Sequence, residues 1–424
     1  MRYKQLKKEG HITRPLILLL VIGGLFAMST ALSNTFVNIY LWRQSGEIID
    51  IALYNLSIVA AQPIAFALSG RLAKIVDRVV VIRTGILILS LFYISVLVLG
   101  GQSAEYLLLL GSLLGTGLGF YWLAFNVLTF EVTEPENRDF FNGFLGILTS
   151  LSGMIGPFFA GYIITRMDKS SGYQTIFTIS LVLFLTGVAA SFFLTKRRSE
   201  GRYDLASVFH NRKDDESWKK LLFAHFFQGI REGTFVFIIV IWVYLSGDGE
   251  LGLGFFGFIQ SAVSFAMYYA VSRFIRREWR MKGIFLGGLI LFISPFMLLM
   301  PLSFSVLLSY GALVSVAYPL LLVPYISVTY DIIGRCRDAS EKRVEYIVVR
   351  EFFLNGGRIT SILIFLLFIM AMPQGKLPYL LPILGSGHFL IYFCLRKLSL
   401  NPNSVCADKN GPSLEMDENK DNNK

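Results

Sequence analysis

The chain has 424 residues, of which 54% are hydrophobic and only 16% are charged. Soluble domains carry about 25% charged residues and disperse their apolar side chains along amphipathic elements. Twelve membrane-spanning helices of about 20 residues each would instead require roughly 240 mainly apolar positions, which is close to what this composition supplies. The composition therefore excludes the soluble globular classes and predicts an all-α membrane protein.

Long apolar runs predict twelve transmembrane helices. Their expected ranges, in chain order, are 16–41, 49–69, 79–100, 105–129, 141–164, 173–195, 221–245, 251–271, 283–302, 304–329, 346–370 and 377–395. The first run follows a basic segment, as in a signal peptide, but its length of about 25 residues favours a retained helix. A polar stretch separates the sixth run from the seventh, and a polar tail follows the last.

The distribution of basic residues predicts the topology. The chain has 39 Lys and Arg against 29 Asp and Glu. If the N-terminus lies inside, 32 of the basic residues fall in inner segments, four in outer segments and three within the predicted spans. The positive-inside rule then places both termini in the cytoplasm. We expect a multi-pass protein of a bacterial plasma membrane, whose partner is the lipid bilayer and not nucleic acid.

The sequence offers no signature of an enzyme. Three cysteines, Cys336, Cys394 and Cys406, and four scattered histidines provide neither a zinc-ligand spacing nor a disulfide framework. The sequence contains no phosphate-binding Gly-x-x-x-x-Gly-Lys-Ser/Thr loop, nucleophile elbow or His-Glu-x-x-His pair. We therefore expect no catalytic residues, no metal, no cofactor and no use of ATP.

Short sequence matches recur about 200 residues apart and in the same order. The pairs are Thr35-Phe36-Val37 with Thr234-Phe235-Val236, Trp42 with Trp242, Thr129-Phe130-Glu131 with Thr329-Tyr330-Asp331, and Arg138-Asp139-Phe140-Phe141 with Arg350-Glu351-Phe352-Phe353. Duplication is common in membrane proteins. We expect two pseudo-symmetric six-helix halves, 1–195 and 221–397, with a cytoplasmic linker at 196–220 and a disordered tail at 398–424.

Three motifs follow or occupy the second, fourth and fifth predicted helices. The loop after the second helix reads Gly70-Arg71-Leu72-Ala73-Lys74-Ile75-Val76-Asp77-Arg78, the turn after the fourth contains Glu131, Pro135 and Arg138, and the fifth carries Gly143, Ser152, Gly156-Pro157 and Ala160-Gly161. These motifs resemble those of the major facilitator superfamily of secondary transporters, over about residues 12–398. Lys74 replaces the aspartate of the family's loop, and Ser and Ala replace two glycines of its antiporter pattern.

The resemblance implies a central cavity lined by the first, fourth, seventh and tenth helices, with a small molecule as the transported partner. The residues on these helices that the resemblance favours as cavity-lining are Asn34, Asn38, Trp122, Asn126, Tyr318 and Tyr325. The resemblance does not specify the oligomeric state, and a monomer is compatible with it.

Charged residues near the inner helix ends are candidates for a gate. They are Lys74, Asp77, Arg78, Glu131, Arg138, Asp139, Arg350 and Glu351. We expect Lys74 to pair with Glu131 or Asp139 in one conformation, although the basic loop could also serve only as an orientation signal. Gly143, Gly156, Pro157 and Gly161 either allow close packing and a bend of the fifth helix or mark an antiporter.

The seventh predicted helix carries the most informative charges. His225, Gln228 and Glu232 share one helical face, and Arg231 precedes Glu232. Glu232 lies about 18 Å along the helix from Lys220, near the middle of a membrane. A charged residue there costs about 2.5 to 3.5 kcal/mol on insertion scales, so it should face the bundle.

Two readings of these residues are open. Glu232 can be the proton-coupling carboxylate, with Arg231 and Gln228 at the substrate cavity. Alternatively, Arg231 and Glu232 neutralise one another or clamp a neighbouring helix. The proton is the expected coupling ion.

The eleventh predicted helix carries a second polar face. Glu351, Asn355 and Arg358 are spaced by four and three residues, and Arg350 precedes them. Because Arg350 and Glu351 are near the inner end, we expect them to form a solvated or locking pair. Asn355 and Arg358 are deeper and are cavity candidates. His388 falls on the peripheral twelfth helix, where we expect a structural role.

The favoured function is secondary active transport by alternating access, with proton-coupled export of a small organic or amphipathic compound. The pattern of the fifth helix and an aromatic content of 14% favour this interpretation. Uptake of an anionic solute is the alternative that Arg231 and Arg358 suggest. A third hypothesis, which the substitution at Lys74 suggests, is a non-transporting membrane sensor or partner that keeps the transporter fold.

The topology can be tested at Cys406. In intact cells, a membrane-impermeant thiol reagent should leave Cys406 unlabelled until the cells are lysed, because the tail is expected to be cytoplasmic. The chain carrying Cys406→Ser controls for labelling of other cysteines. Labelling of Cys406 in intact cells would overturn this orientation.

Overall fold

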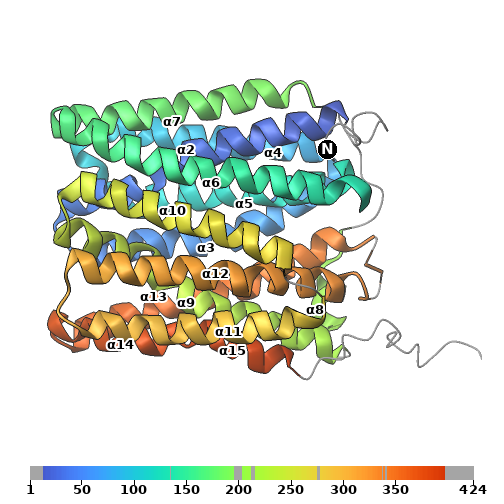
Figure 1. Ribbon diagram of the computed structural model, residues 1–424. Coiled ribbons are helices and arrows are strands. Elements are labelled where there is room, and N and C mark those ends of the chain that lie inside the picture. The colour runs from blue at the N-terminus through green and yellow to red at the C-terminus, as the bar shows by residue number, and fades with distance from the viewer. Residues whose placement is uncertain are drawn as a thin grey trace, which may run out of the picture.

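The computed structural model describes residues 13–133, 135–194, 203–211, 215–274, 277–336, 338–339 and 341–396. These residues form helices and no strands. Figure 1 shows long helices that run side by side along one common direction, and the start of α2 lies at the same end of the bundle as the short helix α8 (Leu205–Asn211). We call this end the linker end and the opposite one the far end.

The chain contributes two sets of long helices, one before and one after α8. The first set is α2 (Arg14–Ser45), α3 (Ile48–Ile75), α4 (Arg78–Leu99), α5 (Leu107–Val132), α6 (Pro135–Arg166) and α7 (Lys169–Ser191). The second set is α9 (Glu216–Ser246), α10 (Gly249–Phe274), α11 (Arg280–Ile293), α12 (Phe304–Ile333), α13 (Arg343–Ala371), α14 (Leu377–Gly385) and α15 (Gly387–Leu395). Short 3-10 helices adjoin them at η1 (Gly100–Tyr106), η2 (Arg277–Trp279), η3 (Ser294–Leu299) and η4 (Gln374–Lys376).

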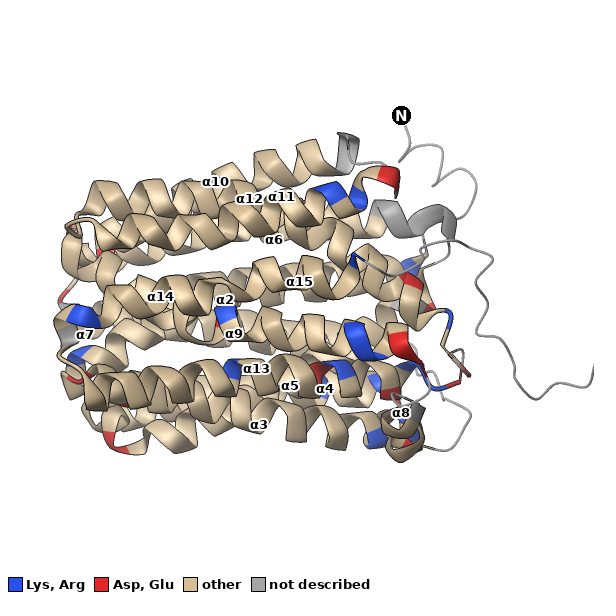
Figure 2. Ribbon diagram, turned by 90° about the horizontal axis from the view of Figure 1, so that it is seen from below, with Lys and Arg blue, Asp and Glu red and all other residues tan. Residues whose placement is uncertain are grey.

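Eleven helical segments of the described chain are long and apolar enough to cross a membrane. One of them, Arg78–Thr129, has 52 residues and contains both α4 and α5, joined through η1. The described chain therefore accounts for twelve crossings, as the sequence predicted. The ninth is made of α11 and η3, and the twelfth of α14 and α15, with Ser386 between them. Figure 2 shows more Lys and Arg at the linker end than at the far end.

Local sequence determines where several helices begin and end. The Thr13 Oγ1 accepts a hydrogen bond of 3.4 Å from the Leu16 amide at the start of α2. The Asp77 Oδ1 accepts a hydrogen bond of 2.6 Å from the Val79 amide at the start of α4. Such side chains satisfy amides that have no partner within the helix. At the end of α2, Gly46 has φ 74°, a left-handed conformation that favours glycine.

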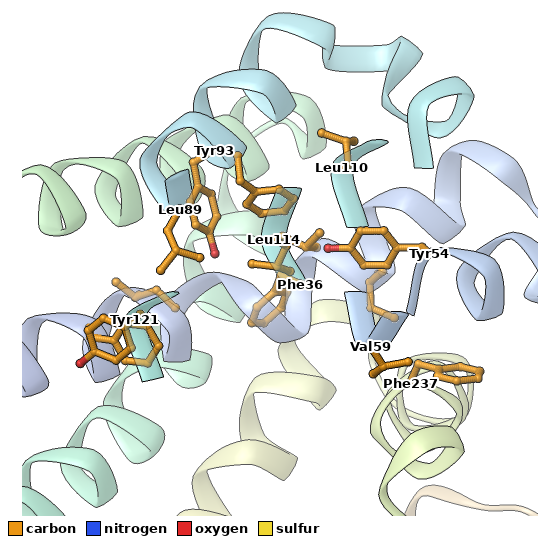
Figure 3. Packing of buried hydrophobic residues seen from close by; sticks show 14 of the residues in the cluster. Phe36, Tyr54, Val59, Leu89, Tyr93, Leu110, Leu114, Tyr121 and Phe237 are labelled. Carbon is orange, nitrogen blue, oxygen red and sulfur yellow. The ribbon is translucent and has the colours of Figure 1, made fainter. Parts of the chain in front are cut away.

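Aromatic and branched side chains fill the interior of the first half (Figure 3). Phe36 of α2, Tyr54 of α3 and Leu89 and Tyr93 of α4 are each at most 1% exposed and lie in one cluster. The Tyr93 hydroxyl is 2.5 Å from the Ser33 Oγ, so this polar atom has a partner inside the apolar core. Since lipid is as apolar as these side chains, close packing and such hydrogen bonds are what hold the helices together.

Glycines bring α6 of the first half against α10 of the second half towards the far end. A Cβ added at Gly161 would lie 2.4 Å from the Glu250 carbonyl oxygen, and one at Gly254 would lie 2.6 Å from the Pro157 carbonyl oxygen. Gly156 faces α2 instead, where an added Cβ would lie 2.8 Å from the Ala31 Cβ. Only glycine permits these approaches.

Gly143 does not take part in this packing. A Cβ added at Gly143 would meet no atom within 4 Å, which corrects the expectation that it is a packing residue. It lies in the first part of α6, where none of residues 142–151 is buried. In α10, none of residues 257–270 is buried. The contact of α6 with α10 nevertheless continues from the far end to Gly153, where an added Cβ would lie 2.7 Å from the Ser261 Oγ.

The contact between α6 and α10 predicts unequal effects of two matched substitutions. Gly161→Ala should lower the free energy of unfolding by about 1 to 3 kcal/mol, because its methyl group overlaps backbone atoms of α10. Gly143→Ala should leave stability unchanged or raise it by up to about 1 kcal/mol, because alanine favours a helix. Thermal unfolding of the purified protein in detergent measures both. Equal effects of the two substitutions would contradict this account of the contact.

Candidate functional site

Glu232 lies at mid-length of α9 and is the centre of a polar cluster. Its Oε2 accepts hydrogen bonds from the Arg358 Nη2 at 2.6 Å and Nε at 3.2 Å. Its Oε1 accepts from the Gln228 Nε2 at 2.8 Å and from the Tyr318 hydroxyl at 3.1 Å. Two nitrogens of one guanidinium fork therefore bind the same carboxylate, an arrangement that adds strength and fixes orientation.

The Glu232 and Arg358 side chains meet because α9 and α13 approach closely. A Cβ added at Gly229 would lie 2.1 Å from the Leu354 carbonyl oxygen, and one at Gly357 would lie 2.0 Å from the Phe226 carbonyl oxygen. These glycines were not singled out from the sequence. Their position on the two helices that carry the charges was the available signal, because small residues mark close helix crossings in membranes.

Arg358 also reaches across to the first half of the protein. Its Nη1 donates to the Asn355 Oδ1 at 3.3 Å and to the Gln62 Oε1 of α3 at 3.4 Å. Asn355 is fully buried and donates to the Glu351 carbonyl oxygen at 3.0 Å. The cluster thus joins α9, α12 and α13 of the second half to α3 of the first half.

Arg231 points away from Glu232 and is 5% exposed. Its Nη2 donates to the Tyr310 hydroxyl at 3.4 Å, and its guanidinium carbon lies 4.8 Å from the centre of the Phe235 ring. Among the described residues, no carboxylate lies within 4.0 Å of it. The alternative that Arg231 and Glu232 neutralise one another is therefore wrong, since consecutive residues of a helix do not face each other.

His388 lies beside the cluster, although its helix was expected to be peripheral. Its side chain is fully buried, and its Nε2 lies 4.0 Å from the Glu232 Oε1. Neither ring nitrogen has a hydrogen-bond partner within the described part of the chain. The preceding Gly387 explains the position, because an added Cβ there would lie 2.3 Å from the Phe227 carbonyl oxygen of α9.

A chain of polar side chains continues from Glu232 towards the linker end. The Gln228 Oε1 is 3.0 Å from the His225 Nδ1, and the His225 Nε2 is 3.3 Å from the Thr329 Oγ1. Tyr325 packs against the His225 ring with its centre 4.8 Å away and is fully buried. Its position is that of a packing residue beside this chain.

The remaining cavity candidates of the first half lie apart from this cluster. Asn38 accepts a 2.8 Å hydrogen bond from Asn55 and donates to the Asn34 carbonyl oxygen at 3.4 Å. Asn34 is exposed and Asn126 is half-buried. Trp122 is 38% exposed and lies edge-on to Phe26. The structure brings none of these side chains within hydrogen-bond distance of Glu232 in the described chain.

The gate candidates at the linker end form two ion pairs, one between the two halves of the protein and one within the first half. Lys74 of α3 pairs with Glu345 of α13, and its Nζ also donates to the Glu341 carbonyl oxygen at 3.1 Å. Arg78 pairs with Glu131 at 2.8 Å. In this conformation Lys74 therefore contacts the opposite half of the protein, and Glu131 is paired with Arg78; the expected pairing of Lys74 with Glu131 or Asp139 in another conformation stays a prediction.

Other gate candidates have more local positions. Asp77 caps α4, and Arg350 pairs with the adjacent Glu351 at 2.5 Å. The side chains of Arg138 and Asp139 lie outside the described part of the structure, although both residues belong to α6.

The linker reinforces the contact between α3 and α13. The Tyr203 hydroxyl donates to the Ala67 carbonyl oxygen of α3 at 3.0 Å, and the Asp204 amide donates to the Glu345 Oε1 of α13 at 3.2 Å. Burial, and then the nearby Glu345 carboxylate, raise the pKa of the Tyr203 phenol, so it remains a neutral donor. Adjacent linker residues therefore bind opposite halves.

A cluster at the far end was not predicted from the sequence. Glu250, 5% exposed in the first turn of α10, accepts from the Arg43 Nη1 of α2 at 2.9 Å, from the Tyr173 hydroxyl of α7 at 3.2 Å and from the Tyr244 hydroxyl of α9 at 3.4 Å. Trp42 packs edge-on against Tyr244, with ring centres 5.9 Å apart. These contacts close the far end between the two halves.

No group of three or more His, Cys, Asp or Glu side chains that could hold a metal ion occurs among the described residues. The chemistry that the central cluster supports is instead the exchange of a proton or an anion at the Glu232 and Arg358 pair. Both side chains keep some exposure, 17% and 23%, so the pair is not sealed in the core.

The fold and this mid-membrane cluster are those of a membrane transporter. A model of the Major Facilitator Superfamily matches residues 18–340 of the chain. The chain belongs to this family, which confirms the resemblance seen in the motifs and the predicted fold class.

Two bacterial proteins are similar in sequence. The uncharacterized protein YqgE of Bacillus subtilis (strain 168) is 52% identical over 418 residues, which cover 98% of this chain and 96% of that protein. An uncharacterized protein encoded in the sodM 3' region of Geobacillus stearothermophilus is 53% identical over 199 residues, or 47% of this chain and 93% of that protein.

Solved transporter structures share the fold. The human organic anion transporter MFSD10 (TETRAN) superposes with a TM-score of 0.68 and 12% identity, over 90% of this chain and all of that one. A bacterial homologue of the iron transporter ferroportin, in an outward-facing state, superposes with a TM-score of 0.66 and 15% identity. The fucose:proton symporter FucP of E. coli superposes with a TM-score of 0.63 and 16% identity. Each covers 90% of this chain and 98% of the other.

The pairing of Lys74 with Glu345 predicts a charge-swap result. Lys74→Glu should destabilise the protein by about 3 to 5 kcal/mol, because a buried carboxylate loses its cation, and Glu345→Lys in the same chain should restore most of the loss. Thermal unfolding in detergent measures both. Lys220→Glu, at an exposed pair with Glu216, is the control and should cost less than about 1 kcal/mol. A double variant no more stable than Lys74→Glu alone would contradict the pairing.

Proposed function

We propose that the protein is a secondary active transporter that works by alternating access and couples solute movement to protons through Glu232. The observation that carries this proposal is the position of Glu232, a carboxylate at mid-length of a transmembrane helix that is bound by Arg358 and remains 17% exposed. Ionisable residues at this depth are costly and commonly mark transport pathways.

Protonation of Glu232 can change the contact between the halves. When Glu232 is ionised, it holds the Arg358 fork on α9. When Glu232 is neutral, that attraction is lost, and Arg358 can engage Asn355 and Gln62 more fully, since both already accept from it. Because Gln62 belongs to the first half, the charge of one carboxylate influences how the two halves are joined.

The structure resembles one of the two states that alternating access requires. The far end is closed by the Glu250 cluster and by the glycine contact of α6 with α10, whereas residues 142–151 of α6 and 257–270 of α10, nearer the linker end, include no buried side chain. The opposite state would break the Glu250 cluster and bring α6 and α10 together at the linker end. We propose that the linker end is cytoplasmic, which the greater number of Lys and Arg there supports (Figure 2).

The proposed solute is a small organic compound. The glycine-rich stretch of α6, which favoured export by antiport, packs Gly156 against α2 and packs Pro157 and Gly161 against α10. Packing therefore accounts for this stretch without an antiport role. The sign of the change in internal pH during solute movement shows whether protons move with the solute or against it.

The test uses Glu232→Gln in proteoliposomes that contain a trapped pH indicator. A panel of organic anions, cations and neutral compounds is added outside, and the internal pH and solute uptake are followed. In the unaltered protein, a transported compound should change the internal pH. In well-expressed Glu232→Gln, this pH change and accumulation against a gradient should vanish, whereas downhill exchange should continue.

Glu216→Gln on the same helix is the matched control, because Glu216 is a well-exposed residue at the linker end. It should transport like the unaltered protein. Accumulation at the normal level by Glu232→Gln would remove Glu232 from the coupling role. Absence of any movement of the panel compounds in the unaltered protein would favour the non-transporting sensor.

A further inference from the structure

The centre of the bundle carries one more positive charge than its carboxylates balance. Arg231, Arg350 and Arg358 are the described cations of this region, and Glu232 and Glu351 are its described carboxylates. Arg350 pairs with Glu351, and Arg358 pairs with Glu232. Among the described residues, the partners of Arg231 are a hydroxyl and an aromatic ring, with no carboxylate.

An arginine that is 5% exposed and lacks a countercharge is expensive, because several kcal/mol are lost when an ion leaves water without a partner. The buried Nε of Arg231 also has no hydrogen-bond partner in the described chain. A bound anion near α9 would lower the cost of this charge, whereas a bound cation would raise it. The local charge therefore favours an anionic solute.

Arg358 provides the atoms that would hold such a solute. Its Nε and Nη2 form the planar fork that now binds one oxygen of Glu232, and the same fork can bind the carboxylate of a small molecule. Its side chain is 23% exposed, so part of the guanidinium remains accessible. Glu232 and a solute carboxylate would compete for the fork.

A displaced Glu232 would be a buried anion with weaker support, held only by Gln228 and Tyr318. Taking up a proton would remove that charge, but the new O–H group would need an acceptor. The Nε2 of His388 is 4.0 Å from the Glu232 Oε1 and has no hydrogen-bond partner among the described residues. A shift of about 1 Å would bring it within hydrogen-bond distance.

We propose that the central cluster binds a small organic anion of the carboxylate class on the fork of Arg358, in exchange for Glu232, and that Glu232 then takes one proton and donates it in a hydrogen bond to His388. This proposal rests on the proposed coupling role of Glu232. One anion and one proton bind together, and no covalent bond of the solute changes. A monocarboxylate and one proton together leave the total charge of the cluster unchanged, whereas a dicarboxylate and one proton also balance the excess positive charge.

The pH dependence of this exchange is set by the groups around Glu232. They are His225 and Arg231 on α9, Tyr318 on α12, Glu351 and Arg358 on α13, and His388 on α15. Since anion and proton bind together, the affinity for the anion should increase as pH falls, by up to tenfold for each pH unit.

The test measures binding to the purified full-length protein in detergent by thermal stabilisation between pH 5.5 and 8. The probes are carboxylates from acetate to citrate, together with the size-matched set of benzoate, benzamide, benzylammonium and phenylphosphonate. Carboxylates should stabilise the protein, and more strongly at low pH, whereas the amide and the ammonium compound should not. Stronger stabilisation by phenylphosphonate than by benzoate would overturn the choice of a carboxylate.

Variants separate the parts of the proposal. Glu232→Gln, which mimics the protonated side chain, should bind carboxylates at least tenfold more tightly at pH 8 and lose the pH dependence. Arg358→Lys, which keeps the charge but lacks the fork, should bind at least tenfold more weakly. Arg280→Gln, at an ion pair with Asp331 on the linker side, is the control and should bind as the unaltered protein does.

The outcomes also distinguish this proposal from the proposed function. If cations or none of the carboxylates stabilise the protein, the anion site is overturned, while proton-coupled transport of another solute in vesicles would leave the coupling role of Glu232 intact. If carboxylates bind equally at all pH values, the exchange with a proton at Glu232 is overturned. If His388→Ala keeps the full pH dependence, the role of His388 as acceptor is overturned.

Discussion

The cost of placing charge in the middle of a membrane is the constraint on which this structure depends. Glu232 can remain there because one guanidinium fork, one amide and one phenol satisfy its two oxygens. Each partner comes from a different place on the chain, so the carboxylate fixes the positions of α9, α12 and α13. The same bonds make the cluster sensitive to a single proton, because neutral Glu232 would no longer need the fork.

Glycines determine how these charges can meet. The approach of α9 to α13 depends on Gly229 and Gly357, and the approach of α6 to α10 depends on Gly161 and Gly254. In lipid, apolar side chains gain little by leaving their solvent, so contacts of backbone with backbone are a major source of helix association. The glycine contacts therefore bring the helices close enough for the charged side chains of the polar cluster to pair.

Composition predicted the helix number, because a bilayer imposes helix length and hydrophobicity on every span, and the motifs of the second, fourth and fifth helices suggested the family. The polar residues within the apolar runs also identified Glu232, Arg358 and Gln228 as residues that face the interior of the bundle. The partners were harder to predict. Arg231 is adjacent to Glu232 in sequence but points elsewhere, and His388 was expected at the periphery. Such pairings depend on how helices cross, and single-chain periodicity does not contain that information.

The two linker contacts have a consequence for the geometry of opening. Tyr203 binds α3 and Asp204 binds α13, so two neighbouring peptide units tie the halves together on one side of the linker end. If the halves rotate relative to one another, these two bonds and the pairing of Lys74 with Glu345 place the axis of rotation along α3 and α13. The side of the linker end away from this axis would then move furthest.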